Sequence, residues 1–174
     1  EITKFTVVIN ALDGDNFLQE DDIKGMLRTK VDTFIGKPIS AVSLREVESV
    51  VEQAPEVFNA EAYIGINGEL KVEVKLKTVI VRVKPDGKTG YYIDLQGKQM
   101  PWVSSFTPRV LVVSGWVNRY HVNSFEKYST EERKEKFNTD LYNFSSFVYQ
   151  DAFWSKQLVQ VHMNYDGDTE LVTL

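Results

Sequence analysis

The sequence predicts an α+β protein with two domains: a β-α-α-β-β unit, followed by a mostly antiparallel β domain with one or two helices. Three observations lead to this prediction. Two helix patterns with apolar faces lie between residues 21 and 54, strand patterns and turn signals fill most of the remaining chain, and the apolar alternation changes phase at Thr78. A length of 174 residues is enough for two small domains, each with a hydrophobic core.

The first strand and helix are predicted from the N-terminal residues. Residues 4–9 alternate between apolar and other side chains, which indicates a strand. Asp21 or Asp22 can then cap a helix, because a carboxylate accepts hydrogen bonds from the free N–H groups of a first helical turn. Gly36 and Pro38 are expected to end this helix. Its apolar face would carry residues at helical spacing, namely Ile23, Met26, Leu27, Val31 and Phe34.

A second helix is predicted to begin after Ser43. Ser43 and Glu46 have the spacing of a capping box, in which the serine hydroxyl accepts from the Glu46 N–H and the Glu46 carboxylate reaches back. The helix must stop near Ala54 because Pro55 follows it. Its apolar face is formed by Leu44, Val47, Val50 and Val51.

A β-hairpin is predicted over residues 58–77. Its arms are Phe58–Ile66 and Glu69–Lys77, joined by Asn67-Gly68. Asn-Gly suits a type I′ turn, whose two central residues need positive φ. The return arm alternates apolar and charged residues, so one face of the sheet is buried and the other faces water. The two helices can then cover one face of a three-stranded sheet.

The domain boundary is predicted at Thr78. Apolar residues stand at even positions before it and at odd positions after it, in Val79, Val81 and Val83. A slip of one residue turns side chains to the opposite face, so a bulge or bend is expected there. We therefore assign residues 1–77 to the first domain and 78–174 to the second, joined by a stiff hinge without a flexible linker.

The second domain is predicted to be rich in strands. A helical pattern begins at Ser129 and continues to Val148, while residues 116–125 are ambiguous. The domain ends in a second hairpin around Asp166-Gly167, whose last arm should lie on an outer edge of the sheet. The predicted strands are Val79–Val83, Tyr91–Leu95, Val110–Val113, Leu158–Asn164 and Thr169–Leu174.

A turn is predicted after the strand that begins at Tyr91. Asp94 to Gly97 supplies turn residues, and Gly97 tolerates a positive φ. Pro101 is then expected to stop regular pairing.

Composition excludes several classes of function. A net charge of -5 argues against general nucleic-acid binding, which needs a basic face. The chain has no cysteine, so disulfides, thiolate catalysis and cysteine zinc sites are excluded. No apolar run reaches the roughly 18 residues of a membrane helix. Because the chain starts at Glu1 without a methionine, we expect an ectodomain whose membrane anchor lies upstream.

The sequence offers no catalytic, cofactor or metal site. His121 and His162 are the only histidines and lack the spacing of a metal or catalytic pair. The acidic run Glu20–Asp22 is typical of a helix N-terminus, where carboxylates favour the helix dipole, and lacks the spaced oxygens of a calcium loop. No glycine-rich phosphate loop or nucleophile motif is present. We therefore expect no enzymatic activity and no cofactor.

Two segments carry a resemblance to a known family. Residues 91–101 read YYIDLQGKQMP and residues 108–115 read PRVLVVSG. Both resemble the signature of the bacterial cell-division family FtsQ/DivIB, nearly residue for residue. The first domain resembles a POTRA (polypeptide-transport-associated) domain, in Gly36–Ile39 and in the pattern from Pro55 to Ala60. In this order, the motifs resemble an FtsQ ectodomain, and residues 140–161 are most similar to Bacteroidetes-type members.

The resemblance implies a function. It implies a divisome scaffold in the bacterial inner membrane, anchored by an N-terminal helix and facing the periplasm, which recruits and binds FtsB/FtsL-type partners during septum formation. The family binds these partners at its C-terminal sheet edge, and the fragment itself is expected to be monomeric. Partner binding by sheet-edge pairing is therefore expected at Thr169, Glu170, Leu171, Val172, Thr173 and Leu174.

The chain departs from the family at two places. Family members carry Arg-x-Pro where this chain has Lys77-Thr78-Val79, and they continue beyond Val172 into a further strand, so we expect the second domain to be truncated. An alternative is a POTRA-bearing component of outer-membrane protein assembly or secretion that binds peptide segments. An upstream single membrane helix would favour the first function, and tandem POTRA repeats with a downstream barrel the second. A small enzyme remains the third alternative.

Overall fold

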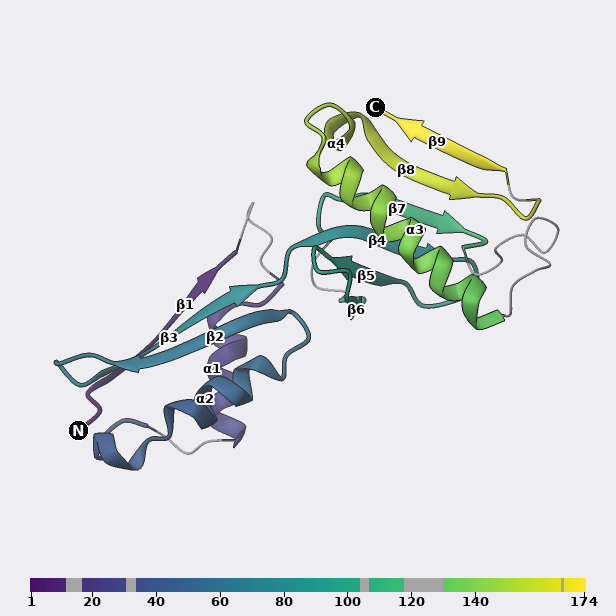
Figure 1. The fold of residues 1–174 in the computed structure, drawn as a ribbon. Helices are drawn as coiled ribbons and strands as arrows, with labels where there is room; N and C mark the ends of the chain where they lie inside the picture. The colour runs from purple at the N-terminus through teal and green to yellow at the C-terminus, as the bar shows by residue number, and fades with distance from the viewer. Residues whose placement is uncertain (12–16, 31–33, 104–106, 118–129, 167) are drawn as a thin grey trace. The chain divides into compact units, whose positions relative to one another are not determined.

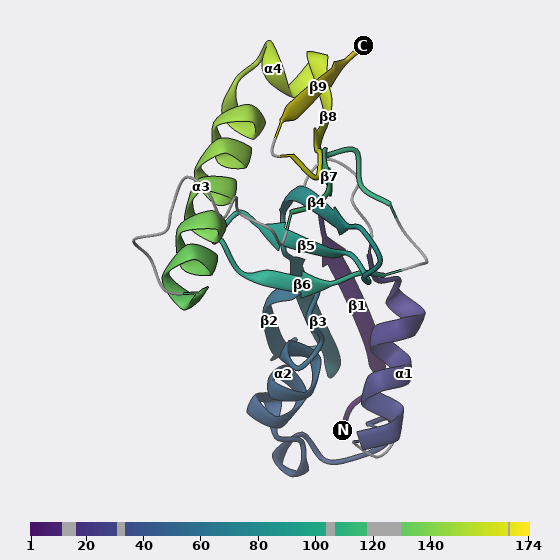
Figure 2. The same cartoon turned by 90° about the vertical axis from the view of Figure 1, so that its right-hand side faces the viewer.

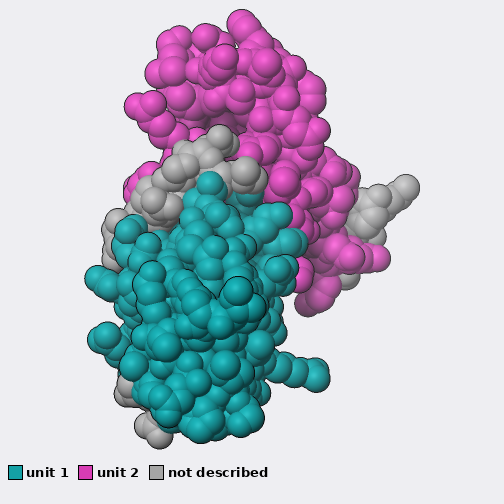
Figure 3. All heavy atoms as spheres, turned by 90° about the vertical axis from the view of Figure 1, so that its left-hand side faces the viewer, with its two compact units in different colours: residues 1–78 teal, residues 79–174 magenta. Residues whose placement is uncertain are grey.

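A computed structural model describes residues 1–11, 17–30, 34–103, 107–117, 130–166 and 168–174. The chain divides into two compact units, Glu1–Thr78 and Val79–Leu174, which Figure 3 draws in teal and magenta. Each unit has its own cluster of buried apolar side chains. Only Lys77 and Thr78 lie between the last strand of the first unit and the first strand of the second.

The first unit has the predicted β-α-α-β-β order, with one added turn of 3₁₀ helix. Its three strands form a sheet in the order β1-β3-β2, with β1 parallel and β2 antiparallel to the central β3. Both helices lie on the same face of this sheet (Figures 1 and 2). The elements are β1 (Lys4–Asn10), α1 (Glu20–Lys30), η1 (Ile39–Ala41), α2 (Leu44–Glu52), β2 (Val57–Ile64) and β3 (Glu69–Leu76).

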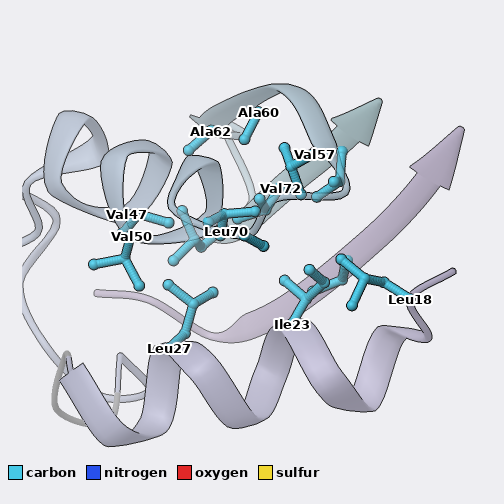
Figure 4. Packing of buried hydrophobic residues seen from close by; sticks show 14 of the residues in the cluster. Leu18, Ile23, Leu27, Val47, Val50, Val57, Ala60, Ala62, Leu70 and Val72 are labelled. Atoms are coloured by element: carbon cyan, nitrogen blue, oxygen red, sulfur yellow. The ribbon is translucent and has the colours of Figure 1, made fainter. Parts of the chain in front are cut away.

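The core of the first unit lies between this sheet and the two helices. Ile23 and Leu27 of α1 and Val47 of α2 point toward Leu70 and Val72 of β3 (Figure 4), and all five are almost completely buried. Burying a side chain of this size contributes about 1.5–3 kcal/mol relative to leaving it exposed. The apolar faces predicted from helical spacing and from strand alternation therefore pack into one buried layer.

The helix starts follow the prediction at α2 but not at α1. Ser43 caps α2, and its hydroxyl accepts from the Glu46 N–H at 3.3 Å, as predicted. At α1, Gln19 precedes the helix, its N–H donates to the Asp22 carboxylate at 2.8 Å, and its carbonyl accepts from the Asp22 and Ile23 N–H groups. The prediction that Asp21 or Asp22 is the cap was therefore wrong. Asp22 is instead the third helical residue, and its carboxylate accepts from the backbone N–H of Gln19 ahead of the helix.

The described part of α1 runs from Glu20 to Lys30 and does not include Phe34. Phe34, predicted as part of the apolar face of this helix, is not helical and is buried in the core. The predicted Val31 lies outside the described residues. Phe34 packs its ring against Phe5 of β1, with ring centroids 5.4 Å apart, so it completes the core from the loop.

The predicted hairpin is formed, with a different turn. The Gly68 N–H donates to the Gly65 carbonyl at 2.9 Å, so the central residues of the turn are Ile66 and Asn67. The predicted type I′ turn centred on Asn67-Gly68 was therefore wrong. Gly68 follows the turn with φ of 77°, and Gly65 pairs with Glu69. This is the three-residue hairpin loop that ends in a left-handed glycine.

The second unit is a six-stranded sheet in the order β6-β5-β4-β7-β8-β9. Its pairings β4–β7 and β7–β8 are parallel and the other three are antiparallel, so the prediction of a mostly antiparallel domain is confirmed. Helix α3 runs across one face of the sheet (Figure 1). The elements are β4 (Val79–Pro85), β5 (Tyr91–Asp94), β6 (Gln99–Pro101), β7 (Leu111–Gly115), α3 (Thr130–Gln150), α4 (Trp154–Gln157), β8 (Leu158–Met163) and β9 (Thr169–Thr173).

Strand β6 was missed by the sequence analysis. Pro101 was expected to stop regular pairing, but it lies opposite Tyr91 at the end of this outer strand. An outer strand tolerates proline because one side of its backbone needs no partner. In the ambiguous segment 116–125, the described residues Trp116 and Val117 are not in a strand, and the rest lies outside the described residues.

The signature segment 91–101 forms a turn that bonds to helix α3. Fully buried Asp94 accepts hydrogen bonds from the Gln96 and Lys98 N–H groups at 3.0 and 2.8 Å, which closes the predicted turn. Gly97 has φ of 77°, as expected for this glycine, and a Cβ there would lie 3.4 Å from the Tyr142 ring. The Tyr142 hydroxyl donates to the Leu95 carbonyl at 3.0 Å. This turn therefore anchors α3 to the sheet.

Candidate interaction edge

The two sheets have four outer strands: β1 and β2 in the first unit, and β6 and β9 in the second. An outer strand presents unpaired N–H and C=O groups, which can pair with a strand of another chain. Proteins that avoid such pairing cover the edge, shorten it or place charges and proline on it. The four outer strands can therefore be compared by how well each is protected.

The outer side of β2 is covered by side chains of α2. The Ala62 N–H donates to the Glu48 carboxylate at 2.9 Å, and the Ala60 N–H donates to the Glu52 carboxylate at 3.4 Å. These are N–H groups that β3 does not use, because Ala60 and Ala62 alternate with the residues that bond to β3. The two glutamates thus occupy the donors that an added strand would need.

Strand β6 and the backbone ahead of β1 are protected in other ways. Strand β6 has three residues and ends in Pro101, which has no N–H to offer. Ahead of β1, the Ile2 N–H donates to the Lys37 carbonyl and the Ile2 carbonyl accepts from the Gly36 N–H, both at 2.9 Å. The backbone that enters β1 is therefore paired on that side.

Among the four outer strands, β9 is the one whose residues are all exposed. It pairs with β8 on one side, as predicted. At its two ends, the Asn164 N–H donates to the Asp168 carbonyl and the Leu174 N–H donates to the Gln157 carbonyl. Because bonded and non-bonded residues alternate in an antiparallel ladder, even-numbered residues face β8. The N–H and C=O groups of Thr169, Leu171 and Thr173 therefore point outward.

The six residues predicted to bind a partner thus fall into three groups. Thr169, Leu171 and Thr173 offer outward backbone groups. Glu170 and Val172 use theirs within the sheet, and the Glu170 carboxylate also accepts from the Asn164 side chain at 2.9 Å. Leu174 lies beyond the end of β9, with its N–H bonded to Gln157 and its side chain 85% exposed.

Exposed apolar side chains lie on this edge and on α3. Leu171 is 57% exposed on the α3 side of the sheet, opposite Val161. On α3, Tyr142 faces the turn after β5, and helical spacing places Phe144 and Phe147 on the side of the helix away from Tyr142. Both phenylalanines are exposed, Phe147 by 57%. The sequence pattern joined them with Leu141 and Val148 in one helix and gave no sign of their exposure.

The two histidines do not form a catalytic pair in the described structure. His121 lies outside the described residues. His162 is half-buried on the face opposite α3, and its Nδ1 lies 2.9 Å from Ser114 Oγ. Ser114 Oγ also accepts from the Gln160 amide at 2.9 Å, so the hydroxyl is held in a network across β7 and β8.

The described residues give no sign of a metal site or a membrane-spanning helix. No group of three or more potential ligands among them could hold a metal ion. In the same parts of the chain, no helix is both long and apolar enough to cross a bilayer.

The outer face of the first sheet is charged and solvated, as predicted. The Lys71 ammonium lies 2.9 Å from the Glu73 carboxylate, which also accepts from the Tyr63 hydroxyl at 2.7 Å. The hydrogen bond from Tyr63, followed by that from Lys71, lowers the pKa of Glu73. Hydrogen bonds to Tyr63 and Glu73 raise the pKa of Lys71. The two charged groups and the hydroxyl thus bind one another on this face.

Comparison with known proteins links these two units to described families. A family model described as FtsQ/DivIB, C-terminal related, matches residues 78–174, and one described as a POTRA-like domain matches residues 2–75. No curated protein matches the chain. Among solved structures, the chain is similar to POTRA1-2 of the periplasmic domain of Omp85 from Anabaena, with 12% sequence identity and a TM-score of 0.32 over 98% of this chain and 93% of that chain.

Proposed function

Since the chain belongs to the FtsQ/DivIB, C-terminal related family, we propose that it is the extracytoplasmic part of a bacterial divisome scaffold. It recruits FtsB/FtsL-type partners during septum formation and has no enzymatic activity. It faces the periplasm, is held at the inner membrane by a helix upstream of Glu1, and is monomeric on its own. The family match over the second unit supports this proposal.

The mechanism is the addition of a partner strand to β9. The observation that carries it is the contrast between two edges: the outer N–H groups of Ala60 and Ala62 on β2 are bonded to glutamates, whereas β9 is exposed along its whole length. A partner strand would exchange hydrogen bonds with the outward groups of Thr169, Leu171 and Thr173. Backbone pairing supplies affinity in this mode, and side-chain contacts supply specificity.

The side-chain contacts would come from the apolar residues beside β9. Alternate residues of the partner strand would lie on the α3 side, next to Leu171, and the exposed Phe144 and Phe147 belong to the helix on the same face of the sheet. Covering these side chains contributes about 25 cal/mol for each Å² of apolar surface buried. The expected partner segment therefore alternates, with apolar residues on the side that faces α3.

The proposal is tested by comparing backbone and side-chain changes at one position. Leu171→Pro removes an outward N–H, while Leu171→Ala keeps it and shortens only the side chain. In the full-length protein, the proline variant should lose capture of an FtsB/FtsL-type partner, and the alanine variant should lose less. Circular dichroism checks that both are folded. Equal capture by a folded proline variant and the parent protein would show that β9 does not pair with the partner.

The alternative is a POTRA-bearing protein that binds peptide segments during outer-membrane assembly or secretion. It would place the peptide on an edge of the first sheet. The occupied N–H groups of β2 disfavour that edge, because the peptide would have to displace Glu48 and Glu52. Peptide capture by the first unit with β9 blocked would favour this alternative.

A further inference from the structure

The second unit has a polar hollow on the sheet face that α3 leaves uncovered. Its volume is about 370 Å³, within the range of small-ligand sites. Two cross-strand rows form its floor, Arg82-Val112-Gln160 and Lys84-Ser114-His162, from β4, β7 and β8. These residues alternate with Val81, Val83, Val113 and Val161, which belong to the core shared with α3.

The hydrogen bonds on this floor determine which groups remain available as donors. Gln160 donates to Ser114 Oγ at 2.9 Å, and Ser114 Oγ lies 2.9 Å from His162 Nδ1. A hydroxyl can donate and accept, so the direction of the second bond depends on the imidazole tautomer. Gln160 keeps the other hydrogen of its amide for a further acceptor. The network therefore leaves at least one donor on the floor of the hollow.

Arg82 is the side chain that most needs a partner. Its guanidinium lies over the Trp102 ring, 5.3 Å from the centroid, which holds it in place. Its Nε is buried and has no hydrogen-bond partner among the described residues. A buried donor without an acceptor is costly, and more so when the group is charged. The Arg82 Nε is thus held in place without an acceptor among the described residues.

We propose that this hollow binds a carboxylate. The planar guanidinium of Arg82 can hold two oxygens side by side, and Lys84 adds a second positive charge. Asp86 also lines the hollow, so Arg82, Lys84 and Asp86 sum to one positive charge, which suits a singly charged ligand better than a phosphate. Val112 offers an apolar contact for the carbon attached to the carboxylate.

The carboxylate can come from an acidic side chain of a bound protein segment or from a free organic acid. Both present the same group to Arg82. This inference does not depend on partner pairing at β9, because the residues that line the hollow lie on β4, β7 and β8 or directly after β4, and none lies on β9. A failure of one proposal therefore leaves the other standing.

The test is an NMR titration of the ¹⁵N-labelled chain at constant ionic strength. Sodium propionate represents a free acid, and the capped peptide acetyl-Gly-Asp-Gly-amide represents a side chain. At least one of them should give saturable shifts at the Trp102 indole N–H and at the Ser114 and His162 amides, and the one with the lower Kd identifies the source. Shifts that stay linear and match those in sodium chloride would overturn the proposal, as would tighter binding of inorganic phosphate.

Matched variants assign the binding to the arginine. Arg82→Gln should raise the Kd at least about tenfold, because it removes a charge-assisted pair of hydrogen bonds. Arg82→Lys should also raise it, since lysine keeps the charge without the planar fork. Lys84→Gln, at an exposed position, should raise it severalfold even if the arginine variants fail to fold. Lys88→Gln removes the same charge outside the hollow and should change nothing. An unchanged Kd in a folded Arg82→Gln or Lys84→Gln variant contradicts the site.

Discussion

Single glycines show where the backbone of the second unit tolerates no side chain. Gly115 ends β7 with φ of 89°, and a Cβ there would lie 2.3 Å from the Met163 carbonyl oxygen and 2.9 Å from His162 Cε1. Gly87 has a similar φ of 67°, but a Cβ there would meet nothing within 4 Å. Substituting alanine at Gly87 therefore measures the cost of the backbone conformation alone. The same substitution at Gly115 adds the cost of the close approach of β8.

We expect Gly87→Ala to lower the free energy of unfolding by about 1–2 kcal/mol, the cost of a left-handed alanine. Gly115→Ala should cost clearly more, because β7 and β8 must move apart. Denaturant titration followed by tryptophan fluorescence measures both, since all three tryptophans (Trp102, Trp116 and Trp154) lie in the second unit. Equal losses would show that the approach of β8 to Gly115 is not tight.

The Tyr142 hydroxyl gives a second prediction for a single residue. Tyr142→Phe removes the hydrogen bond to the Leu95 carbonyl at 3.0 Å and keeps the ring against Gly97. We expect a loss of about 0.5–1.5 kcal/mol in the free energy of unfolding, the usual net value of such a bond. The same fluorescence titration measures it. No loss would mean that water replaces the hydroxyl without cost.

Residue patterns predicted some local structure and missed what depends on distant contacts. Gly97 was expected to take positive φ, and it does. The turn of the first hairpin was misplaced because the bond from Gly68 to Gly65 closes it one residue earlier than the Asn-Gly pair suggests. In the same way, Gln19 caps α1 only because Asp22 bonds back to it, and glutamine is a weak cap on its own.

The order of elements was predictable, but the protection of their edges was not. Periodicity indicates which face of α2 is buried, and it correctly selected Val47, Val50 and Val51. It cannot show that Glu48, on the other flank, reaches the Ala62 N–H of β2. That contact joins residues 14 positions apart in sequence and exists only after helix and strand have packed.

This contact gives a prediction for the β2 edge. Glu48→Ala removes the acceptor, so the Ala62 amide should exchange with solvent faster, by about tenfold for a bond worth about 1.4 kcal/mol. Glu48→Gln keeps an acceptor oxygen and should change the rate less. Hydrogen exchange followed by NMR measures both variants. If the Ala62 amide exchanged equally fast in the parent and in Glu48→Ala, the glutamate would not protect this edge.

For the whole molecule, two separate cores explain why the family matches divide where they do. The buried clusters contain residues 2–76 and 80–161, and the two matches cover residues 2–75 and 78–174. The change of phase at Thr78 had led us to predict a boundary between residues 77 and 78. The sequence also suggested the outer position of the last strand, but it gave no sign that Phe144 and Phe147 of α3 are exposed.

The two cores predict that the units fold independently. Residues 1–78 and 79–174, produced separately, should each give dispersed NMR spectra that overlay on that of the whole chain, apart from residues near the cut. Each unit buries its own apolar faces, so neither needs the other to form a core. A collapsed, poorly dispersed spectrum from either piece would contradict independent folding.

The central claim is that a partner strand pairs with β9, and hydrogen exchange of the full-length protein tests it most directly. On addition of an FtsB/FtsL-type partner, the amides of Thr169, Leu171 and Thr173 should become protected, because their N–H groups point outward and gain acceptors. Those of Glu170 and Val172, already bonded to β8, should change less. The account would be contradicted if the partner bound without protecting the amides of Thr169, Leu171 and Thr173. It would also be contradicted if the amides of β2 became protected instead.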